Sequence, residues 1–295
     1  MTKPLSIYKR ESDSRKLLQA YDQVMNGWSC PYEEIALPTA YGVCHVIASG
    51  PRDGEPLLFV HGMTVNSAIW YPTINELQAY RTYCIDIPGD FGKSTVTRRI
   101  RSAGDGIGWL DEVIAALTDG PVTLVGHSLG GWLCAGYTLA KPDTISRLLL
   151  LAPIATFLPP PYLNLLRYVY PAMLLPAPWL IQRAWSWFCA PGNTLPPDVM
   201  EMITAAYTYC RSQLPVIPGV YPDDAWSGIR APVLILVGEQ EVVYDPGALR
   251  RRASELLPYA HIQTIPQAGH CLTVEQAGVV NKEISSFLNA HKAGT

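Results

Sequence analysis

The chain has 295 residues, with 22 Lys or Arg against 25 Asp or Glu, so its formal net charge is −3. Only 16% of the residues are charged and 48% are hydrophobic, whereas an ordinary domain carries about 25% charged residues. This composition excludes a disordered chain. The lack of a basic excess also argues against a nucleic-acid partner. A large buried core is therefore expected.

The predicted elements begin with a helix and two β-rich runs and continue as apolar strands that alternate with helices. A charged amphipathic helix is expected over residues 1–27, followed by a hairpin or meander made by the β-rich runs 34–37 and 43–48. Further apolar runs cover residues 57–60, 82–85, 122–125, 148–151, 233–237 and 262–265. Helical stretches are predicted at 73–80, 108–117, 132–140, 248–256 and 275–289. Apolar strands that alternate with helices are typical of a parallel α/β sheet.

The interval from residue 155 to residue 226 interrupts this alternation. It holds 12 of the 26 prolines, and short segments rich in Leu, Trp and Tyr lie between them. We interpret it as a mostly helical cap inserted between two strands. The predicted domains are thus a core of residues 1–154 and 227–295 and a cap of residues 155–226.

Cysteine usage and the N-terminus indicate the compartment. The seven cysteines are scattered without a C-x-x-C pair, so neither a zinc site nor a redox motif is predicted. The first 16 residues are charged and lack the apolar stretch of a signal peptide. No uncharged apolar run of 18 residues suggests a membrane span. We therefore expect a cytoplasmic protein with no integral membrane segment, and a homodimer stays open.

Ser128 lies between two glycines in Gly126-His127-Ser128-Leu129-Gly130, after one predicted strand and before a predicted helix. Such a junction forms a strained turn that lifts the serine hydroxyl above the sheet. The start of the helix also offers free N–H groups to a developing negative charge. A glycine-rich turn with an inert serine is the alternative, but the flanking elements favour a nucleophile.

A nucleophilic serine needs a base, and the base needs an acid that orients it. His270 follows the last predicted strand, although a solvated loop histidine is the alternative interpretation. The acid is expected after the strand 233–237, where the chain offers Glu241 and Asp245. The loop His61-Gly62-Met63 follows another strand and offers a second backbone N–H, beside that of Leu129, to an oxyanion. One such donor contributes about 3–4 kcal/mol in the transition state.

Five motifs in this order resemble the α/β-hydrolase superfamily, and the resemblance covers about residues 33–290. The motifs are His61-Gly62, the segment Asp86-Ile-Pro-Gly-Asp-Phe-Gly-Lys-Ser94, the Gly126–Gly130 turn, the acid loop after Gly238, and Gly269-His270. Capped, esterase-like members are the most similar. The resemblance implies an eight-stranded, mostly parallel sheet with a lid after the sixth strand.

The resemblance also implies the role of each site residue. Ser128 would be the nucleophile and His270 the base, with the N–H groups of Met63 and Leu129 as the oxyanion hole. The family usually has an Asp three residues after the strand-end glycine, where this chain has Glu241. We expect Glu241 to orient His270, with Asp245 as the alternative. A serine at position 128 argues against the haloalkane dehalogenases and epoxide hydrolases, which use an Asp there.

Aromatic residues of the cap and of the site motifs suggest an apolar substrate pocket. Trp70, Trp132, Trp187 and Tyr207 are the predicted lining residues, and cap core is the alternative for each. We therefore expect a serine carboxylesterase that acts on a small apolar ester, with no metal and no organic cofactor. A C–C bond hydrolase, a lactonase or thioesterase, and a non-catalytic ligand receptor with this fold are the alternatives.

Overall fold

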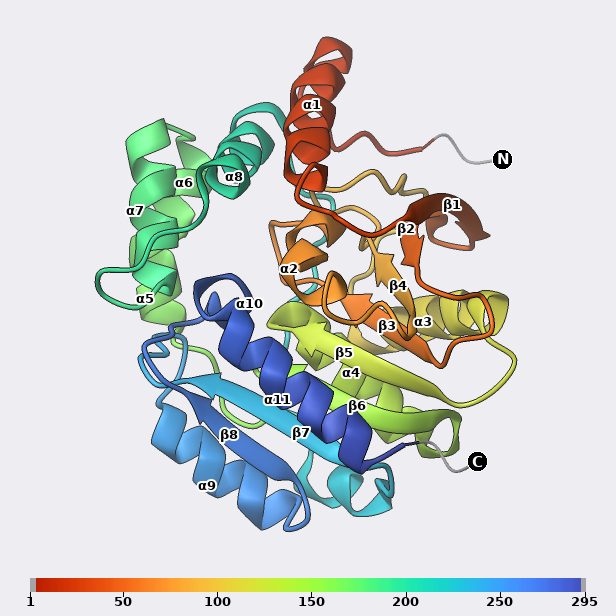
Figure 1. Ribbon diagram of the computed structural model, residues 1–295. Helices are drawn as coiled ribbons and strands as arrows, with labels where there is room; N and C mark the ends of the chain where they lie inside the picture. The colour runs from red at the N-terminus through yellow and green to blue at the C-terminus, as the bar shows by residue number, and fades with distance from the viewer. Residues whose placement is uncertain (1–3, 293–295) are drawn as a thin grey trace.

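The computed structural model describes residues 4–292, which build one eight-stranded sheet in the order β1-β2-β4-β3-β5-β6-β7-β8 (Figure 1). Its strands are β1 (Tyr32–Thr39), β2 (Gly42–Ser49), β3 (Pro56–Val60), β4 (Arg81–Ile85), β5 (Val122–His127), β6 (Ile145–Leu151), β7 (Val233–Gly238) and β8 (His261–Ile265). Strand β2 is antiparallel to both of its neighbours, and all other pairs are parallel. The predicted mostly parallel, eight-stranded sheet is confirmed.

The central strands are apolar along their whole length because both of their faces are covered. All six residues of β5 and all six of β7 are buried. Neighbouring residues of one strand enter different cores, as the two-residue period of a strand requires. Thus Phe59 packs in the core under α11 (Ala277–Ala290), while Leu58 packs in the core that contains Trp109 of α3 (Ala103–Leu117).

The remaining helices differ in part from the predicted ranges. Besides α3 and α11 they are α1 (Ser14–Met25), α2 (Tyr71–Ile74), α4 (Leu129–Ala140), α5 (Tyr162–Tyr168), α6 (Tyr170–Leu174), α7 (Pro178–Phe188), α8 (Pro197–Tyr209), α9 (Pro246–Leu256) and α10 (Leu272–Glu275). None of the helices within residues 4–292 has both the length and the apolar character that crossing a membrane requires.

Three of the predicted helix boundaries are wrong. The helix expected at 73–80 is instead a 3₁₀ turn, Ser67–Trp70, followed by α2. Helix α3 begins at Ala103, five residues earlier than predicted, because the Ser102 side chain caps it by accepting a hydrogen bond from the Asp105 N–H. The helix expected over residues 1–27 covers only α1 after a 3₁₀ turn, and residues 1–3 lie outside the described part.

The segment between β6 and β7 contains helices α5–α8, which lie together at one end of the sheet (Figure 1). Helix α1 packs beside α8. The Lys9 ammonium donates hydrogen bonds to the carbonyl oxygens of Tyr207 and Thr208, at 2.9 and 2.8 Å, at the end of α8. A cation at the carboxyl end of a helix is favourable. The N-terminal segment therefore holds α8, a contact that the sequence analysis did not predict.

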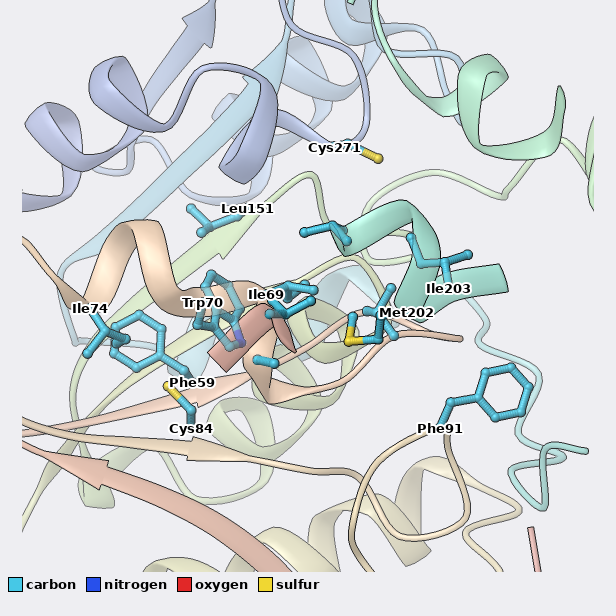
Figure 2. Packing of buried hydrophobic residues seen from close by; sticks show 14 of the residues in the cluster. Phe59, Ile69, Trp70, Ile74, Cys84, Phe91, Leu151, Met202, Ile203 and Cys271 are labelled. Carbon is cyan, nitrogen blue, oxygen red and sulfur yellow. The ribbon is translucent and has the colours of Figure 1, made fainter. Parts of the chain in front are cut away.

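A hydrophobic cluster joins α8 to the sheet (Figure 2). Phe59 of β3 and Trp70 pack edge to face with ring centroids 5.2 Å apart. Met202 and Ile203 of α8 lie on the side of Ile69 and Trp70 that faces away from Phe59. The 3₁₀ turn after β3 thus forms a layer between the sheet and α8.

We expect Gly130→Ala to destabilise the protein by about 1–3 kcal/mol, because a Cβ at position 130 would lie 2.0 Å from the carbonyl oxygen of Val60. Gly278→Ala in α11 is the matched control, since nothing lies within 4 Å of its added Cβ and alanine is the better helix former. Urea denaturation measures both variants. Equal stability of the two variants would contradict the close approach of α4 to β3.

Candidate active site

Ser128 lies at the turn between β5 and α4 with a backbone φ of 52° and ψ of −116°. This left-handed conformation is strained for a residue with a side chain, and such strain is found where function requires it. The flanking glycines permit the turn. A Cβ on Gly126 would lie 2.4 Å from the carbonyl oxygen of Gly130. The serine is therefore held at the carboxyl edge of the sheet by a turn that larger neighbours would disrupt.

The side chains of Ser128, His270 and Glu241 form a continuous hydrogen-bonded series. The Ser128 Oγ lies 2.8 Å from Nε2 of His270, and Nδ1 of His270 lies 2.9 Å from Oε2 of Glu241. The other carboxylate oxygen of Glu241 accepts hydrogen bonds from the N–H groups of Val242 and Val243, at 2.8 and 2.9 Å. This geometry assigns the Nδ1–H to the bond with Glu241. Nε2 is then free to accept the serine proton.

The alternative acid Asp245 and the nearby carboxylate of Glu239 have different partners. Asp245 caps α9, where its side chain accepts a hydrogen bond from the Ala248 N–H. Glu239 accepts a hydrogen bond from the Gln267 N–H at 3.1 Å. The structure therefore brings Glu241, and neither Asp245 nor Glu239, to His270.

His127 supports the base from within the serine turn. Its Nε2 lies 2.8 Å from the carbonyl oxygen of His270, and a carbonyl can only accept, so Nε2 carries the proton. Burial and the neighbouring His270 lower the pKa of His127 to about 3. The ring is therefore neutral and fixes the His270 main chain. In the sequence, the signal for this role of His127 is its position inside the Gly126–Gly130 turn motif.

The loop after β8 is also tied to the end of α7. The His270 N–H donates a hydrogen bond to the carbonyl oxygen of Phe188 at 2.7 Å. The Glu275 carboxylate accepts hydrogen bonds from the N–H groups of Gly269 and Ala190, at 3.0 and 2.6 Å. One carboxylate thus joins the loop that carries His270 to the segment after α7.

Cys189, Cys271 and Glu275 bring their donor atoms within 4.8 Å of one another. Two thiolates and a carboxylate are ligand types that zinc accepts. However, a hydrogen bond with Cys189 and burial raise the pKa of the Cys271 thiol, which favours the protonated form. Since Glu275 is already hydrogen-bonded to two backbone N–H groups, we assign the cluster to the link between α7 and the base loop.

Met63 and Leu129 face Ser128 from two sides. Leu129 is the first residue of α4, so its N–H has no partner within the helix. Gly62 lies against the serine, because a Cβ there would be 3.1 Å from the Ser128 Cβ. Within residues 4–292 neither the Met63 N–H nor the Leu129 N–H donates to a protein acceptor. Both are available to an oxyanion.

Buried side chains hold the Met63 loop in place. His61 accepts a hydrogen bond at Nε2 from the Ile87 N–H, 3.0 Å away, and so has a structural role. Asp90 accepts a hydrogen bond from the Thr64 N–H at 2.8 Å, and Thr64 has a left-handed φ of 65°. The Tyr207 hydroxyl lies 3.2 Å from the Thr64 Oγ1. The sequence analysis missed Asp90, although it lies in the Asp86–Ser94 motif.

Asp90 is fully buried, and its Oδ1 has no hydrogen-bond partner in the described part of the chain. Burial raises the pKa of this carboxyl to about 7, and the nearby charge of Asp86 adds to the effect. Desolvation disfavours the ionised form of a carboxyl group. The Met63 loop is therefore held by a carboxyl group whose pKa is raised to about 7.

An apolar cavity of about 200 Å³ opens above Ser128 and His270. The segment between β6 and β7, which contains helices α5–α8, supplies about half of its lining residues. Representative lining residues are Ile154, Leu165, Met173, Phe188, Val199 and Ile203. Met63 and Leu129 also border it. The cavity thus places apolar surface next to the serine hydroxyl.

The four aromatic residues predicted to line the pocket lie outside this lining. Trp70 is fully buried in the cluster of Figure 2. Trp132 donates its indole N–H to the carbonyl oxygen of Gly219 at 2.8 Å. Trp187 stacks on Tyr168 with ring centroids 4.8 Å apart. These contacts correct the prediction for the tryptophans, because each ring packs against another part of the protein.

Tyr207 is the fourth correction. It lies one turn beyond Ile203 on α8, and its hydroxyl contacts the Thr64 Oγ1. The four-residue spacing of Val199, Ile203 and Tyr207 places all three on one helix face. Only Val199 and Ile203 reach the cavity.

Comparisons with known proteins support the geometry. A model of the alpha/beta hydrolase family matches residues 57–283. A Bacillus subtilis protein named uncharacterized carboxylesterase nap is 32% identical over 292 residues, covering 97% of this chain and 96% of the relative. The crystal structure of naproxen esterase (carboxylesterase NP) from the same organism is 30% identical, covers 95% of this chain and 99% of that chain, and has a TM-score of 0.89. Carboxylesterase CesB (YbfK) from Bacillus subtilis is similar at a TM-score of 0.88 and 30% identity, covering 97% and 100%.

We expect Glu241→Gln to slow the labelling of Ser128 by a fluorophosphonate by about 10²–10⁴-fold, because the amide cannot stabilise an imidazolium. Asp245→Asn should label within about threefold of the wild type, since asparagine also caps helices well. A larger loss at Asp245 than at Glu241 would assign the orienting acid to Asp245.

Asp90 gives a pH-dependent prediction for stability. The native carboxyl has its pKa raised to about 7, whereas an unfolded Asp titrates near ~3.9. Between these values the native state binds more protons, so the Asp90 contribution to the free energy of unfolding falls as pH rises. Asp90→Asn cannot ionise and should gain about 1–4 kcal/mol relative to the wild type between pH 4 and pH 8.

Urea denaturation across this pH range measures the effect, with exposed Asp53→Asn as the control. A constant stability difference between Asp90→Asn and the wild type would contradict a carboxyl that titrates near neutrality.

Proposed function

Since the chain belongs to the alpha/beta hydrolase family, we propose that it is a serine carboxylesterase that cleaves esters with an apolar acyl or alcohol group. The observation that carries this proposal is the series Ser128–His270–Glu241 at the base of an apolar cavity. The carboxylesterase relatives support the same reaction class.

In the first half of the reaction, the Ser128 Oγ attacks the carbonyl carbon of the ester and His270 Nε2 takes the serine proton. Glu241 accepts the Nδ1–H and stabilises the imidazolium that forms. Negative charge develops on the former carbonyl oxygen, which the N–H groups of Met63 and Leu129 bind. Collapse of the tetrahedral intermediate expels the alcohol, which takes its proton from His270.

In the second half, water attacks the acyl-serine ester and gives its proton to His270. The second tetrahedral intermediate releases the carboxylic acid and returns the proton to Ser128 Oγ. The sum is one ester and one water converted to one acid and one alcohol. Every proton moves through Nε2 of His270, so the chemistry needs only the side chains and backbone groups described above.

The apolar lining supports a preference for apolar chains. Each methylene group that leaves water for such a surface contributes about 0.8 kcal/mol. Assignment of residues 155–226 to a separate cap belongs to the same proposal, because α5–α8 supply much of the lining. A cytoplasmic location and a homodimer stay predictions from the sequence.

We expect Ser128→Ala to lower kcat for a p-nitrophenyl ester by about 10⁴–10⁶-fold and to abolish labelling by a fluorophosphonate. Ser227→Ala is the control, because Ser227 is exposed and its hydroxyl contacts only the Asp224 carbonyl among the described residues. Turnover by Ser128→Ala close to that of Ser227→Ala would overturn the assignment of the nucleophile.

A further inference from the structure

A second cavity, of about 460 Å³, adjoins the apolar cavity above Ser128. Met63, Thr64 and Met173 border both cavities. The two cavities therefore meet at the Met63 loop and at Met173. We call it the annex.

Three arginines line the annex, namely Arg99, Arg101 and Arg211. They come from the loop before α3 and from the segment after α8. In the described part of the chain none of the three forms an ion pair with a carboxylate. This concentration of positive charge is notable in a chain with a net charge of −3.

Two carboxylates contact the main chain of annex residues. Asp105 accepts a hydrogen bond from the Arg98 guanidinium at 2.7 Å and another from the Arg101 main-chain N–H at 3.1 Å. Asp90 lies buried behind Thr64 and accepts its N–H. Neither carboxylate is among the residues that line the annex. The positive charge of the cavity is therefore not neutralised from within.

Hydrogen bonds fix the positions of residues that line the annex. Arg99 donates from Nε and Nη2 to the side-chain oxygen of Gln213, at 3.0 and 2.6 Å. The Gln213 N–H donates to the carbonyl oxygen of Gly89 at 2.7 Å, and the Arg211 N–H donates to that of Ile7 at 2.6 Å. Gln213 is uncharged, so it orients Arg99 without cancelling its charge.

We propose that the annex binds an anionic group, a carboxylate or a phosphate, that the ester substrate carries away from its reacting carbonyl. Guanidinium groups pair with either anion through parallel N–H···O bonds. The preferred substrate is then an ester with an apolar middle and an anionic end, such as a half-ester of a dicarboxylic acid. This inference rests on the proposed esterase function, because it extends the substrate of the same site.

The test compares three methyl esters of equal chain length. They are methyl hexanoate, monomethyl adipate, and the methyl ester of 6-phosphooxyhexanoic acid. The wild type is compared with the triple variant Arg99→Gln, Arg101→Gln, Arg211→Gln. The control is Arg230→Gln, Arg250→Gln, Arg251→Gln, which removes the same charge from exposed arginines elsewhere. For each protein, the measured quantity is kcat/KM for an anionic ester divided by kcat/KM for methyl hexanoate.

We expect this ratio to fall by about tenfold or more in the annex variant, because each exposed ion pair between an arginine and the anionic group contributes up to about fivefold. In the control variant the ratio should stay within about twofold of the wild type. Added NaCl should reduce the preference of the wild type for anionic esters, because salt screens the attraction between the arginines and the anionic group. A fall for only one anionic ester identifies carboxylate or phosphate as the anion. Equal ratios in the wild type and the annex variant for both anionic esters overturn the proposal.

A binding measurement separates this proposal from the esterase function. Ser128→Ala protein is titrated with monomethyl adipate, the phosphorylated ester and methyl hexanoate, with NMR line broadening as the readout, with and without the three annex substitutions. Tighter binding of an anionic ester that the annex substitutions abolish supports the annex even if the wild type hydrolyses no ester. Indistinguishable binding of all three esters refutes the annex even if esterase activity is present.

Discussion

The close approach of Gly130 to the carbonyl oxygen of Val60 is the constraint on which the site depends. Strands β3 and β5 run parallel in a register that pairs Val60 with Gly126, so the loop after β3 and the start of α4 meet at the same edge of the sheet. A side chain at position 130 would push α4 away from β3. The loop that contains Met63 would then lie farther from the start of α4, which contains Leu129, and the strained backbone of Ser128 needs the same tight turn.

Buried carboxylates hold the loops around that turn. Asp86 accepts hydrogen bonds from the N–H groups of Ser67 and Lys93, each at 2.8 Å, and so joins the loops after β3 and β4. Burial alone would raise its pKa, but His45, 3.0 Å away, and the backbone donors hold the pKa well below its usual range. Asp90 has fewer donors, and burial prevails there. The pKa values of two aspartates four residues apart therefore shift in opposite directions because their hydrogen-bond partners differ.

The features that could be predicted from the sequence are those that depend on residues close together along the chain or on the general geometry of a parallel sheet. The buried strands could be predicted because both faces are covered and the runs are apolar throughout. Ser128, His270 and Glu241 could be brought together because parallel strands end at one edge. The residues that line the cavity could not be predicted. Which face of each of the helices α5–α8 meets the cavity depends on how distant parts of the chain pack. Trp187 and Phe188 are neighbours in sequence, yet only Phe188 lines the cavity. The support of α8 by α1 and Lys9 depends on contacts across about 200 residues.

The hydrogen bonds that join the end of α7 to the His270 loop, those of Glu275 included, link the size of a bound substrate to the position of His270. The Phe188 side chain lines the cavity, while its carbonyl oxygen accepts the hydrogen bond of the His270 N–H. Gly269 lies against the same carbonyl, since a Cβ there would be 2.5 Å from it. A ligand that displaces the end of α7 therefore also displaces the imidazole from Ser128. By linkage, an ester large enough to move the end of α7 would lower turnover as well as affinity, because widening the cavity would also weaken the hydrogen bond that holds His270 in place.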